Sequence, residues 1–213
     1  MRAYYEDFWR DAPADPEPWA WEARRRMLLA EARPGERVLD LGCGAGRFLA
    51  ALAAAGADAV GVDVAEAALE RARAVAPGAD LRLLEPDGSI PLEHGSVDLV
   101  WCSEVLEHVA DAGYLLAEVR RVLRPGGRLL TTVPYHGRLQ AAAIALTRFE
   151  THFDPLGQHL RFFTRRSLVA TLEHAGLEAR RVAGWGGVPL ARRGLVALAV
   201  RAEALPVASR PHG

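Results

Sequence analysis

Short apolar runs alternate with amphipathic stretches along most of this chain, as in a repeated β-α-β pattern. The apolar runs cover residues 38–41, 59–63, 80–84, 96–102 and 128–133. Helical spacing of apolar positions covers 47–55, 65–75 and 111–123. Strands that are almost wholly apolar are typical of parallel sheets covered on both faces. The pattern therefore predicts an α/β fold, with helices on both faces of a mostly parallel sheet.

The regions on either side of this pattern complete a single predicted domain. An aromatic arm leads into a helix over 19–33, and we interpret the arm either as a cover for the edge of the core or as a lid over a bound cofactor. Thr164 is expected to cap a helix over 165–175, which two further strands follow at 177–182 and 195–201. We divide the chain into an arm and first helix, a ligand-binding core, an insertion, a C-terminal helix with two strands, and a tail: 1–33, 36–135, 135–163, 164–202 and 203–213.

The most informative stretch is 38–46, where an apolar strand ends in Asp40 and glycines follow at alternate positions. Gly42, Gly44 and Gly46 lack a Cβ, so the chain can turn sharply there and a ligand can lie against the backbone. The N–H groups of the helix that follows add partial positive charge. Such a loop is weak evidence alone, because glycines also serve tight turns that bind nothing.

Polar residues at the ends of the neighbouring strands strengthen the prediction. Asp63 comes about twenty residues after the glycine loop, where a carboxylate can bind a ribose diol. Asp87 and Ser103 follow the third and fourth predicted strands. The carboxyl ends of parallel strands share one edge, and ligands bind there. We therefore predict one ligand site along that edge.

Four of these segments resemble, in order and spacing, the successive motifs of class I S-adenosylmethionine-dependent methyltransferases. They are Asp-Leu-Gly-Cys-Gly-Ala-Gly at 40–46, Gly-Val-Asp at 61–63, a block at 98–108 that ends in Glu-Val-Leu-Glu-His, and Leu-Arg-Pro-Gly-Gly at 123–127. The chain is most similar to the ubiquinone/menaquinone-type and small-molecule O-methyltransferases. The resemblance implies a Rossmann-like, doubly wound sheet of seven strands whose last strand runs antiparallel.

The resemblance also implies a site for S-adenosyl-L-methionine, with S-adenosyl-L-homocysteine as product. Asp40 would face the amino end of the cofactor, Asp63 the ribose hydroxyls, and Asp87 the adenine. Asp87 stands three residues before Ile90, whereas the family's adenine acid usually stands four residues before a Leu-Pro pair. The expected cofactor residues lie in the arm or at strand ends: Tyr5, Asp40, Gly42, Cys43, Gly44, Asp63, Val64, Asp87, Gly88 and Ser103.

Methyl transfer to oxygen needs an aligned acceptor and a group that accepts its proton. Histidine suits that task at neutral pH, and His108, His152 and His159 are the catalytic candidates, with His136 nearby. We favour His152 because it follows the predicted helix over 139–149, in a loop free to face the cleft, and belongs to the insertion expected to select the acceptor.

Glu104, Glu107 and His108 raise the alternative of a bound metal ion. In a helix their spacing would place all three on one face, where they could chelate a divalent cation. Some quinone O-methyltransferases similar to this chain carry such a metal, whereas many relatives share these residues without one. A solvated or capping face is the commoner explanation, so the sequence interpretation assigns no metal.

Charge and cysteine content indicate the expected binding partners and cellular compartment. The chain of 213 residues carries 26 basic and 27 acidic side chains, a net charge of -1 that provides no general attraction to nucleic acid or membranes. Cys43 and Cys102 occur in a chain without a recognisable signal peptide, which predicts reduced thiols in the cytoplasm. No apolar run reaches membrane-spanning length. We expect a monomer or homodimer that acts on a small molecule, with no nucleic-acid partner.

Two other classes of protein remain open at this point. A nicotinamide-dependent oxidoreductase would use a similar glycine loop and acid, but it does not predict the segments at 98–108 and 123–127. A regulatory or scaffold protein that binds S-adenosylmethionine without turnover would keep all four segments.

Overall fold

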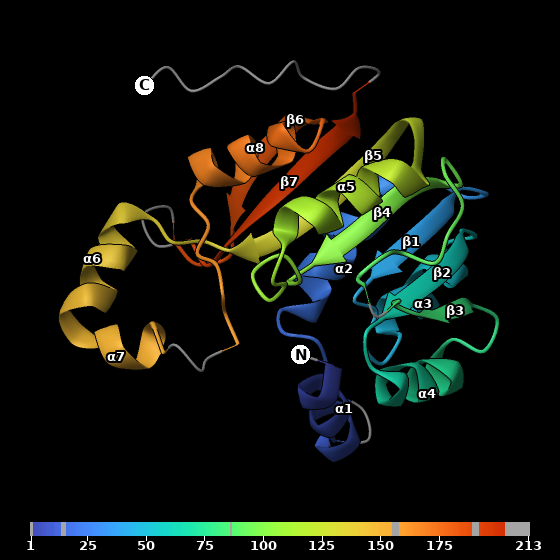
Figure 1. The fold of residues 1–213 in the computed structure, drawn as a ribbon, viewed down its shortest axis with the longest axis horizontal. Helices are drawn as coiled ribbons and strands as arrows, with labels where there is room; N and C mark the ends of the chain where they lie inside the picture. The colour runs from blue at the N-terminus through green and yellow to red at the C-terminus, as the bar shows by residue number, and fades with distance from the viewer. Residues whose placement is uncertain (1, 14–15, 86, 155–157, 189–191, 203–213) are drawn as a thin grey trace.

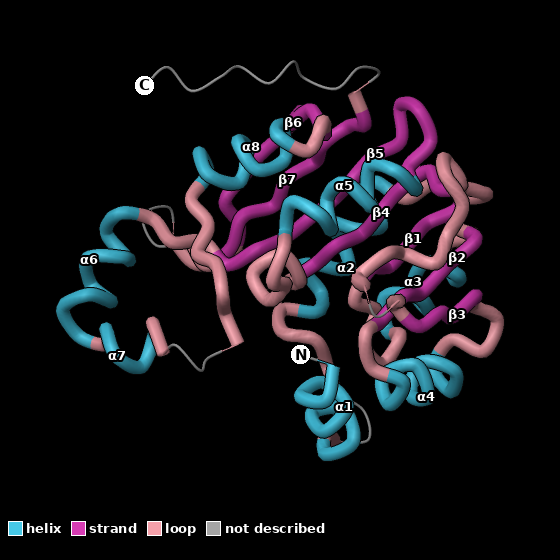
Figure 2. The backbone as a smooth tube through the Cα atoms, viewed as in Figure 1, coloured by secondary structure: helices cyan, strands magenta, loops and turns pink. Residues whose placement is uncertain are grey.

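The computed structural model describes residues 2–13, 16–85, 87–154, 158–188 and 192–202, which form one sheet with helices around it (Figures 1 and 2). The strands are β1 (Arg37–Leu41), β2 (Asp58–Asp63), β3 (Asp80–Leu83), β4 (Val97–Ser103), β5 (Leu123–Pro134), β6 (Leu177–Trp185) and β7 (Gly194–Arg201). The helices are α1 (Arg2–Asp11), α2 (Trp21–Glu31), α3 (Arg47–Ala54), α4 (Glu66–Val75), α5 (Ala112–Val122), α6 (Arg138–Thr147), α7 (Phe149–His152) and α8 (Arg165–His174).

The seven strands lie in the order β3-β2-β1-β4-β5-β7-β6. Neighbouring strands pair in parallel from β3 to β5, whereas β7 runs antiparallel to both β5 and β6. This arrangement confirms the predicted seven-stranded, doubly wound sheet with an antiparallel last strand. The chain leaves β1 towards β2 and β3 and then returns to β4 on its other side. The carboxyl ends of β1 and β4 therefore border a switch point, where open α/β sheets bind ligands.

Alternate residues of the central strands enter two separate hydrophobic cores. Val38 and Trp101 pack with side chains of α2, α3 and α4, whereas Leu39 and Val100 pack with those of α5 and α8. Figure 1 shows α5 and α8 on the same side of the sheet. Because the side chains of a strand alternate between faces, a strand covered on both sides must be apolar at nearly every position.

Several local structures follow the sequence signals. The Thr164 side chain accepts a hydrogen bond from Ser167 N, and the Ser167 side chain accepts one from Thr164 N, so a capping box begins α8. The carboxylate of Asp111 accepts a hydrogen bond from Tyr114 N at the start of α5. The predicted insertion helix is divided into α6 and α7, which project from the sheet at the left of Figure 1. Within the described part of the chain, the helices are too short or too polar to cross a bilayer.

The aromatic arm forms a helix, α1, which packs beside α4. The residue before α4 is Ala65, which has no side chain that can cap the helix. Glu6 of α1 takes that role, because its carboxylate accepts hydrogen bonds from Glu66 N at 2.7 Å and Ala67 N at 3.1 Å. Arg2 donates to the carbonyl oxygens of Val64 at 3.1 Å and Leu84 at 2.5 Å. These contacts fix α1 across the carboxyl ends of β2 and β3.

We expect Glu6→Ala to loosen α1. Loss of a helix cap should speed hydrogen exchange of the α1 amides by about fivefold to about thirtyfold. Asp7→Ala is the matched control, since Asp7 is exposed and pairs with Arg10 within α1. Exchange that is equally fast in both variants would show that Glu6 does not hold the helix. Mass spectrometry of peptides from α1 gives the measurement.

Candidate functional site

Three adjoining cavities follow the carboxyl edge of the sheet. The central one has a volume of about 300 Å³ and lies among the ends of β1, β2 and β4, with α1 as one wall. A second, of about 470 Å³, includes Asp87 and Gly88 and shares Val64 and Leu84 with the first. A third, of about 350 Å³, lies over the glycine loop and includes Arg24. Together they form an elongated site in the predicted place.

The glycine loop turns as its sequence predicts. Gly42 has φ +78° and Gly44 has φ +52°, in the left-handed region that favours glycine. A Cβ on Gly44 would lie 2.7 Å from the indole of Trp9, and one on Gly42 would lie 2.6 Å from a methyl carbon of Val105. The absence of side chains thus lets α1 and the segment after β4 approach the loop.

Asp63 ties this loop to the end of β2. One carboxylate oxygen accepts a hydrogen bond from Gly44 N at 2.9 Å, and the other accepts one from Ala65 N at 3.0 Å. Asp63 is buried but borders the central cavity. Burial raises the pKa of Asp63, while the backbone hydrogen bonds act in the opposite direction. Because Asp63 borders the central cavity, its carboxylate could also accept a hydrogen bond from a hydroxyl group there.

Asp40 is a buried residue of β1, close to the Arg24 guanidinium and the Asp63 carboxylate. Its side chain is 2% exposed, and its Oδ2 atom accepts no hydrogen bond from the described residues. Burial raises the pKa of Asp40 to about 8, against the attraction of the Arg24 guanidinium. A buried carboxyl oxygen without a donor can accept a hydrogen bond from a ligand, and a cationic ammonium group would also favour the ionised form of Asp40.

Arg24 is a site residue that the sequence interpretation missed. Although it is charged, it is buried on α2 and donates to Ser103 Oγ at 2.9 Å. Ser103 Oγ lies 2.6 Å from Thr132 Oγ1, which donates to Glu104 Oε1 at 2.9 Å. Because Thr132 donates to Glu104, the Ser103 hydroxyl must donate to Thr132. This chain of hydrogen bonds orients Arg24, whose guanidinium also lies over the ring of Phe48.

Residues expected around the adenine lie at the other end of the site. Asp87 is exposed, and its carboxylate accepts hydrogen bonds from the backbone and hydroxyl of Ser89, which lower its pKa. Val64 borders both the central cavity and the second cavity, which includes Asp87. Tyr5 of α1 lines the central cavity, and burial raises its pKa to about 12. Cys43 lines the glycine-loop cavity, and it and Cys102 are buried, free thiols.

The three candidate histidines divide between two places. His108 lines the central cavity, and its ring centroid is 4.9 Å from that of His159. His152 is the last residue of α7 rather than part of a loop, and its Nε2 is 3.0 Å from Nε2 of His136. His152 is not among the residues that line the central cavity.

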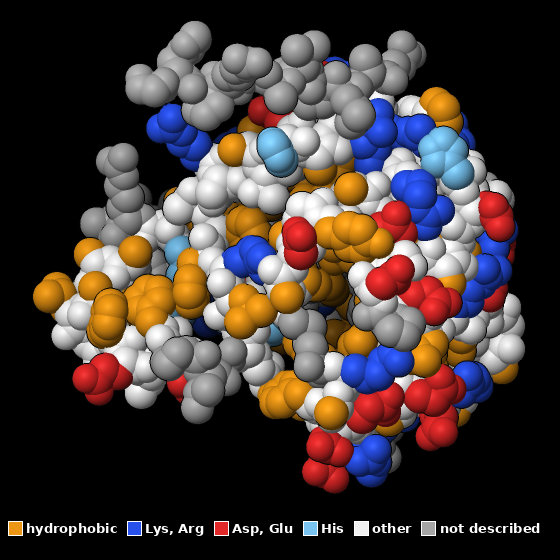
Figure 3. Space-filling model, viewed as in Figure 1, with side chains coloured by type: hydrophobic (Ala, Val, Ile, Leu, Met, Phe, Trp, Pro, Cys, Tyr) orange, Lys and Arg blue, Asp and Glu red, His pale blue; other side chains and the backbone are white. Residues whose placement is uncertain are grey.

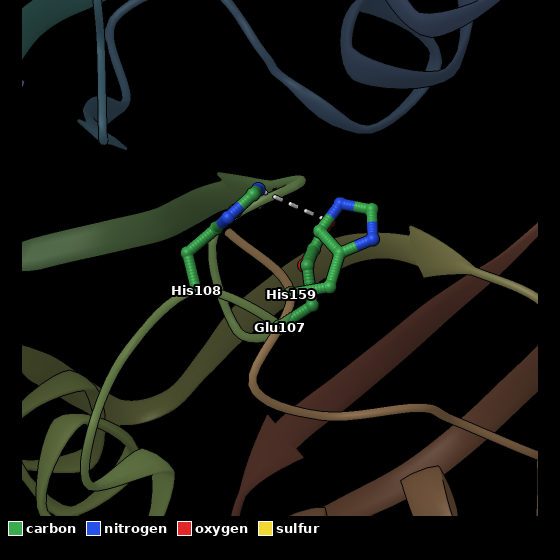
Figure 4. Close-up of side chains that lie close together, drawn as sticks. All are labelled: Glu107, His108 and His159. Carbon is green, nitrogen blue, oxygen red and sulfur yellow. Dashed lines mark ion pairs between the residues drawn. The ribbon is translucent and has the colours of Figure 1, made fainter. Parts of the chain in front are cut away.

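The helical interpretation of Glu104, Glu107 and His108 is wrong. Residues 104–110 form turns, and Glu104 has φ +56°. Its amide donates to Thr132 O at 2.9 Å, which extends the β4–β5 pairing and prevents a helix from starting. Its carboxylate bonds to Thr132 instead of joining the other two side chains. Glu107 and His108 instead face His159, and one ligand atom from each of these three lies within 4.8 Å of the others (Figure 4).

Comparison with known proteins agrees with this geometry. Residues 39–131 match the family model for a methyltransferase domain. A ubiquinone biosynthesis O-methyltransferase of Aromatoleum aromaticum is 32% identical over 170 residues, which cover 73% of this chain and 70% of that protein. An uncharacterized 37.1 kDa protein in transposon TN4556 of Streptomyces fradiae is 44% identical over 110 residues, 49% of this chain, and the match covers 32% of that protein. The crystal structure of an S-adenosylmethionine-dependent methyltransferase from Mesorhizobium loti has the same fold, with a TM-score of 0.68, 24% identity and coverage of 90% and 99% of the two chains.

A site at the carboxyl edge of a doubly wound sheet is typical of α/β proteins that bind a nucleotide-like cofactor. The relatives specify which kind of protein this is. The chain belongs to the class I S-adenosylmethionine-dependent methyltransferases. The curated relatives that match most of its length include several ubiquinone biosynthesis O-methyltransferases. The predicted family, fold and enzyme class are thereby confirmed.

The raised pKa of Asp40 predicts a pH dependence of stability. Its ordinary pKa is 3.8, so the unfolded chain releases the proton that the folded protein retains up to about pH 8. The folded state then binds more protons than the unfolded state, and the free energy of unfolding falls as pH rises through this window, by at most about 1.4 kcal/mol per pH unit. Asp40→Asn should remove this contribution.

Urea unfolding of the cofactor-free protein at several pH values is the measurement. The difference in stability between Asp40→Asn and the wild type should grow as pH rises. Asp58→Asn, at the exposed start of β2, should follow the wild type. Parallel curves for the wild type and Asp40→Asn would contradict the expected titration.

Proposed function

We propose that this enzyme transfers the methyl group of S-adenosylmethionine to an oxygen atom of a small phenol, quinol or hydroxylated metabolite. The observation that carries the proposal is the match between the elongated site and the cofactor's polar groups. Asp63 offers acceptors for a ribose diol, and at the glycine-loop end Arg24 offers a positive charge and Asp40 a carboxyl group that a bound ammonium would ionise. A methionine moiety carries an ammonium and a carboxylate, which suit these two side chains.

The remaining cofactor residues fit the same orientation. Asp87, Gly88 and Val64 would border the adenine, and Tyr5 would cover the cofactor from α1. Gly42, Cys43 and Gly44 would present bare backbone to the methionine portion, with Ser103 behind it. The assignment rests on the cavities that these residues line.

The chemistry requires little from the protein beyond alignment and exclusion of water. The sulfonium of the cofactor supplies an activated methyl group. As the acceptor oxygen forms its bond to carbon, the sulfur–carbon bond breaks, and the acceptor's hydroxyl proton must leave. Alignment alone can lower the barrier by about 7–11 kcal/mol in favourable models. We interpret α1, with Trp9 against the glycine loop, as the lid that keeps water out.

We propose that the insertion at 135–163 selects the acceptor. Gln158 from this segment lines the central cavity. His136, His152 and Phe162 pack together, with the ring of Phe162 within 5.4 Å of both histidine rings. An oxygen acceptor is supported by relatives that are named ubiquinone biosynthesis O-methyltransferases.

The test combines binding with turnover. Calorimetry should show that S-adenosylhomocysteine binds and raises the melting temperature, whereas NAD(H) and NADP(H) do neither. Methyl transfer is then assayed on a panel of phenols, alcohols and sugars. Binding without transfer to any member of the panel would favour the second candidate, a cofactor-binding protein without turnover.

Asp63→Asn should weaken S-adenosylhomocysteine binding by about 1.5–3 kcal/mol, since charge-assisted bonds to the ribose would be lost. Asparagine retains an oxygen for one backbone amide, so it disturbs the loop less than alanine would. Asp58→Asn, at the other end of β2, is the control. Unchanged affinity in folded Asp63→Asn would rule out the ribose assignment.

His152→Ala should raise KM for the acceptor about tenfold, with kcat changed little. The reason is that His152 supports the shape of the insertion at a place outside the central cavity. Cofactor affinity should stay the same. The sequence alone favours His152 as the base, and that role makes a different prediction. A large fall in kcat with loss of one limb of the pH–rate profile would support the base instead.

A further inference from the structure

Glu107 is a buried carboxylate without hydrogen-bond donors. Its side chain is 1% exposed, and neither carboxylate oxygen accepts a hydrogen bond from the described residues. Burial, and then the nearby Glu104, raise its pKa. Such a group is costly unless a cation or a donor satisfies it. Nε2 of His108 lies 3.8 Å from Glu107 Oε1, which is too long for a hydrogen bond.

The backbone holds His159 against this carboxylate. The amides on its C-terminal side, Leu160 N and Arg161 N, donate to Glu107 O at 2.8 and 3.2 Å. The Arg161 guanidinium also donates to the carbonyls of Val109 and Ala110. The returning segment of the insertion is thus fixed along the turn at 107–110, although it lies about fifty residues further along the chain.

A hydrogen bond fixes the ring of His108 as well. Its Nδ1 lies 3.0 Å from the carbonyl oxygen of Gln158, so Nδ1 carries the proton and Nε2 keeps its lone pair. A backbone carbonyl on the other ring nitrogen is the usual partner of a metal-binding histidine. Figure 4 shows Glu107 and His159 close together, with the ring of His108 beside them.

We propose that Glu107, His108 and His159 bind one divalent transition-metal ion beside the central cavity. Ligand atoms around such an ion lie about 3.3–4.2 Å apart. The three groups now lie within 4.8 Å of one another, and His159, the ligand from the insertion, is exposed. Two imidazoles and one carboxylate favour Zn²⁺, Co²⁺ or Fe²⁺ over Mg²⁺, which prefers oxygen ligands.

This ligand set differs from the one that sequence spacing suggests. Glu104 is bonded to Thr132 and does not take part, whereas His159 comes from the insertion. Three protein ligands leave coordination positions free, as in catalytic metal sites. If the proposed function holds, an ion there would bind the acceptor's oxygen and favour loss of its proton. The existence of the site does not depend on that role.

The experiment measures metal binding without turnover. Tag-free protein, stripped with a chelator, is titrated with Co²⁺, and the visible absorption of nitrogen-bound Co²⁺ reports occupancy. We expect one equivalent to bind, Zn²⁺ to displace it and a hundredfold excess of Mg²⁺ to leave it, following the preference of imidazole ligands. Glu107→Gln and His159→Ala should each weaken binding by about tenfold or more.

His174→Ala is the matched control, because His174 is an exposed histidine on α8. His159 is exposed, so its variant should fold, and the melting temperature checks this. Equal Co²⁺ affinity in His159→Ala, His174→Ala and wild type would overturn the site. Displacement by Mg²⁺, with binding lost in Glu104→Gln instead, would overturn the ligand set. S-adenosylhomocysteine binding is measured on the same samples, and its failure would count against the proposed function alone.

Discussion

The site depends on one buried carboxylate that holds two loops at once. Asp63 accepts one backbone amide from the glycine loop after β1 and another from the turn after β2. These loops leave adjacent parallel strands, and each carries N–H groups that would otherwise lack partners. A short acidic side chain at the end of β2 can reach both. Its burial opposes ionisation, whereas the two hydrogen bonds and the neighbouring start of α4 favour it.

Local patterns in the sequence predict this part of the molecule well. Apolar runs mark strands buried on both faces, and the alternation of Val38 and Leu39 between two cores shows why both positions must be apolar. Arg24 is different, although a signal was available. It lies three residues after Trp21 and four before Leu28, on the stripe that faces the core. A charged residue at such a position indicates a buried polar partner, which proves to be Ser103.

Contacts between distant segments could not be predicted in the same way. Nothing in the sequence near Glu6 indicates that its side chain caps a helix sixty residues further on. The position of α1 depends on that contact. Spacing suggests a helix for Glu104 to His108, but the pairing of Glu104 N with Thr132 O continues the sheet past that point. The insertion shows the same limit. Its helix was predictable, but its surface was not: Leu146 is 87% exposed and Phe149 58%, and apolar side chains gather over α6 and α7 at the left of Figure 3.

The docking of α1 has a consequence for the speed of the enzyme. Tyr5, Phe8 and Trp9 of α1 line the central cavity, so a cofactor bound there as proposed would have to pass α1 on leaving. If α1 is the lid that we propose, each catalytic cycle would include an opening event, in which Glu6 releases the start of α4 and Arg2 releases two carbonyl oxygens. Such movements occur in microseconds to milliseconds and often limit turnover. Glu6 and Arg2, although far from the reacting atoms, would then limit the maximum kcat, because their contacts set the lifetime of the closed state.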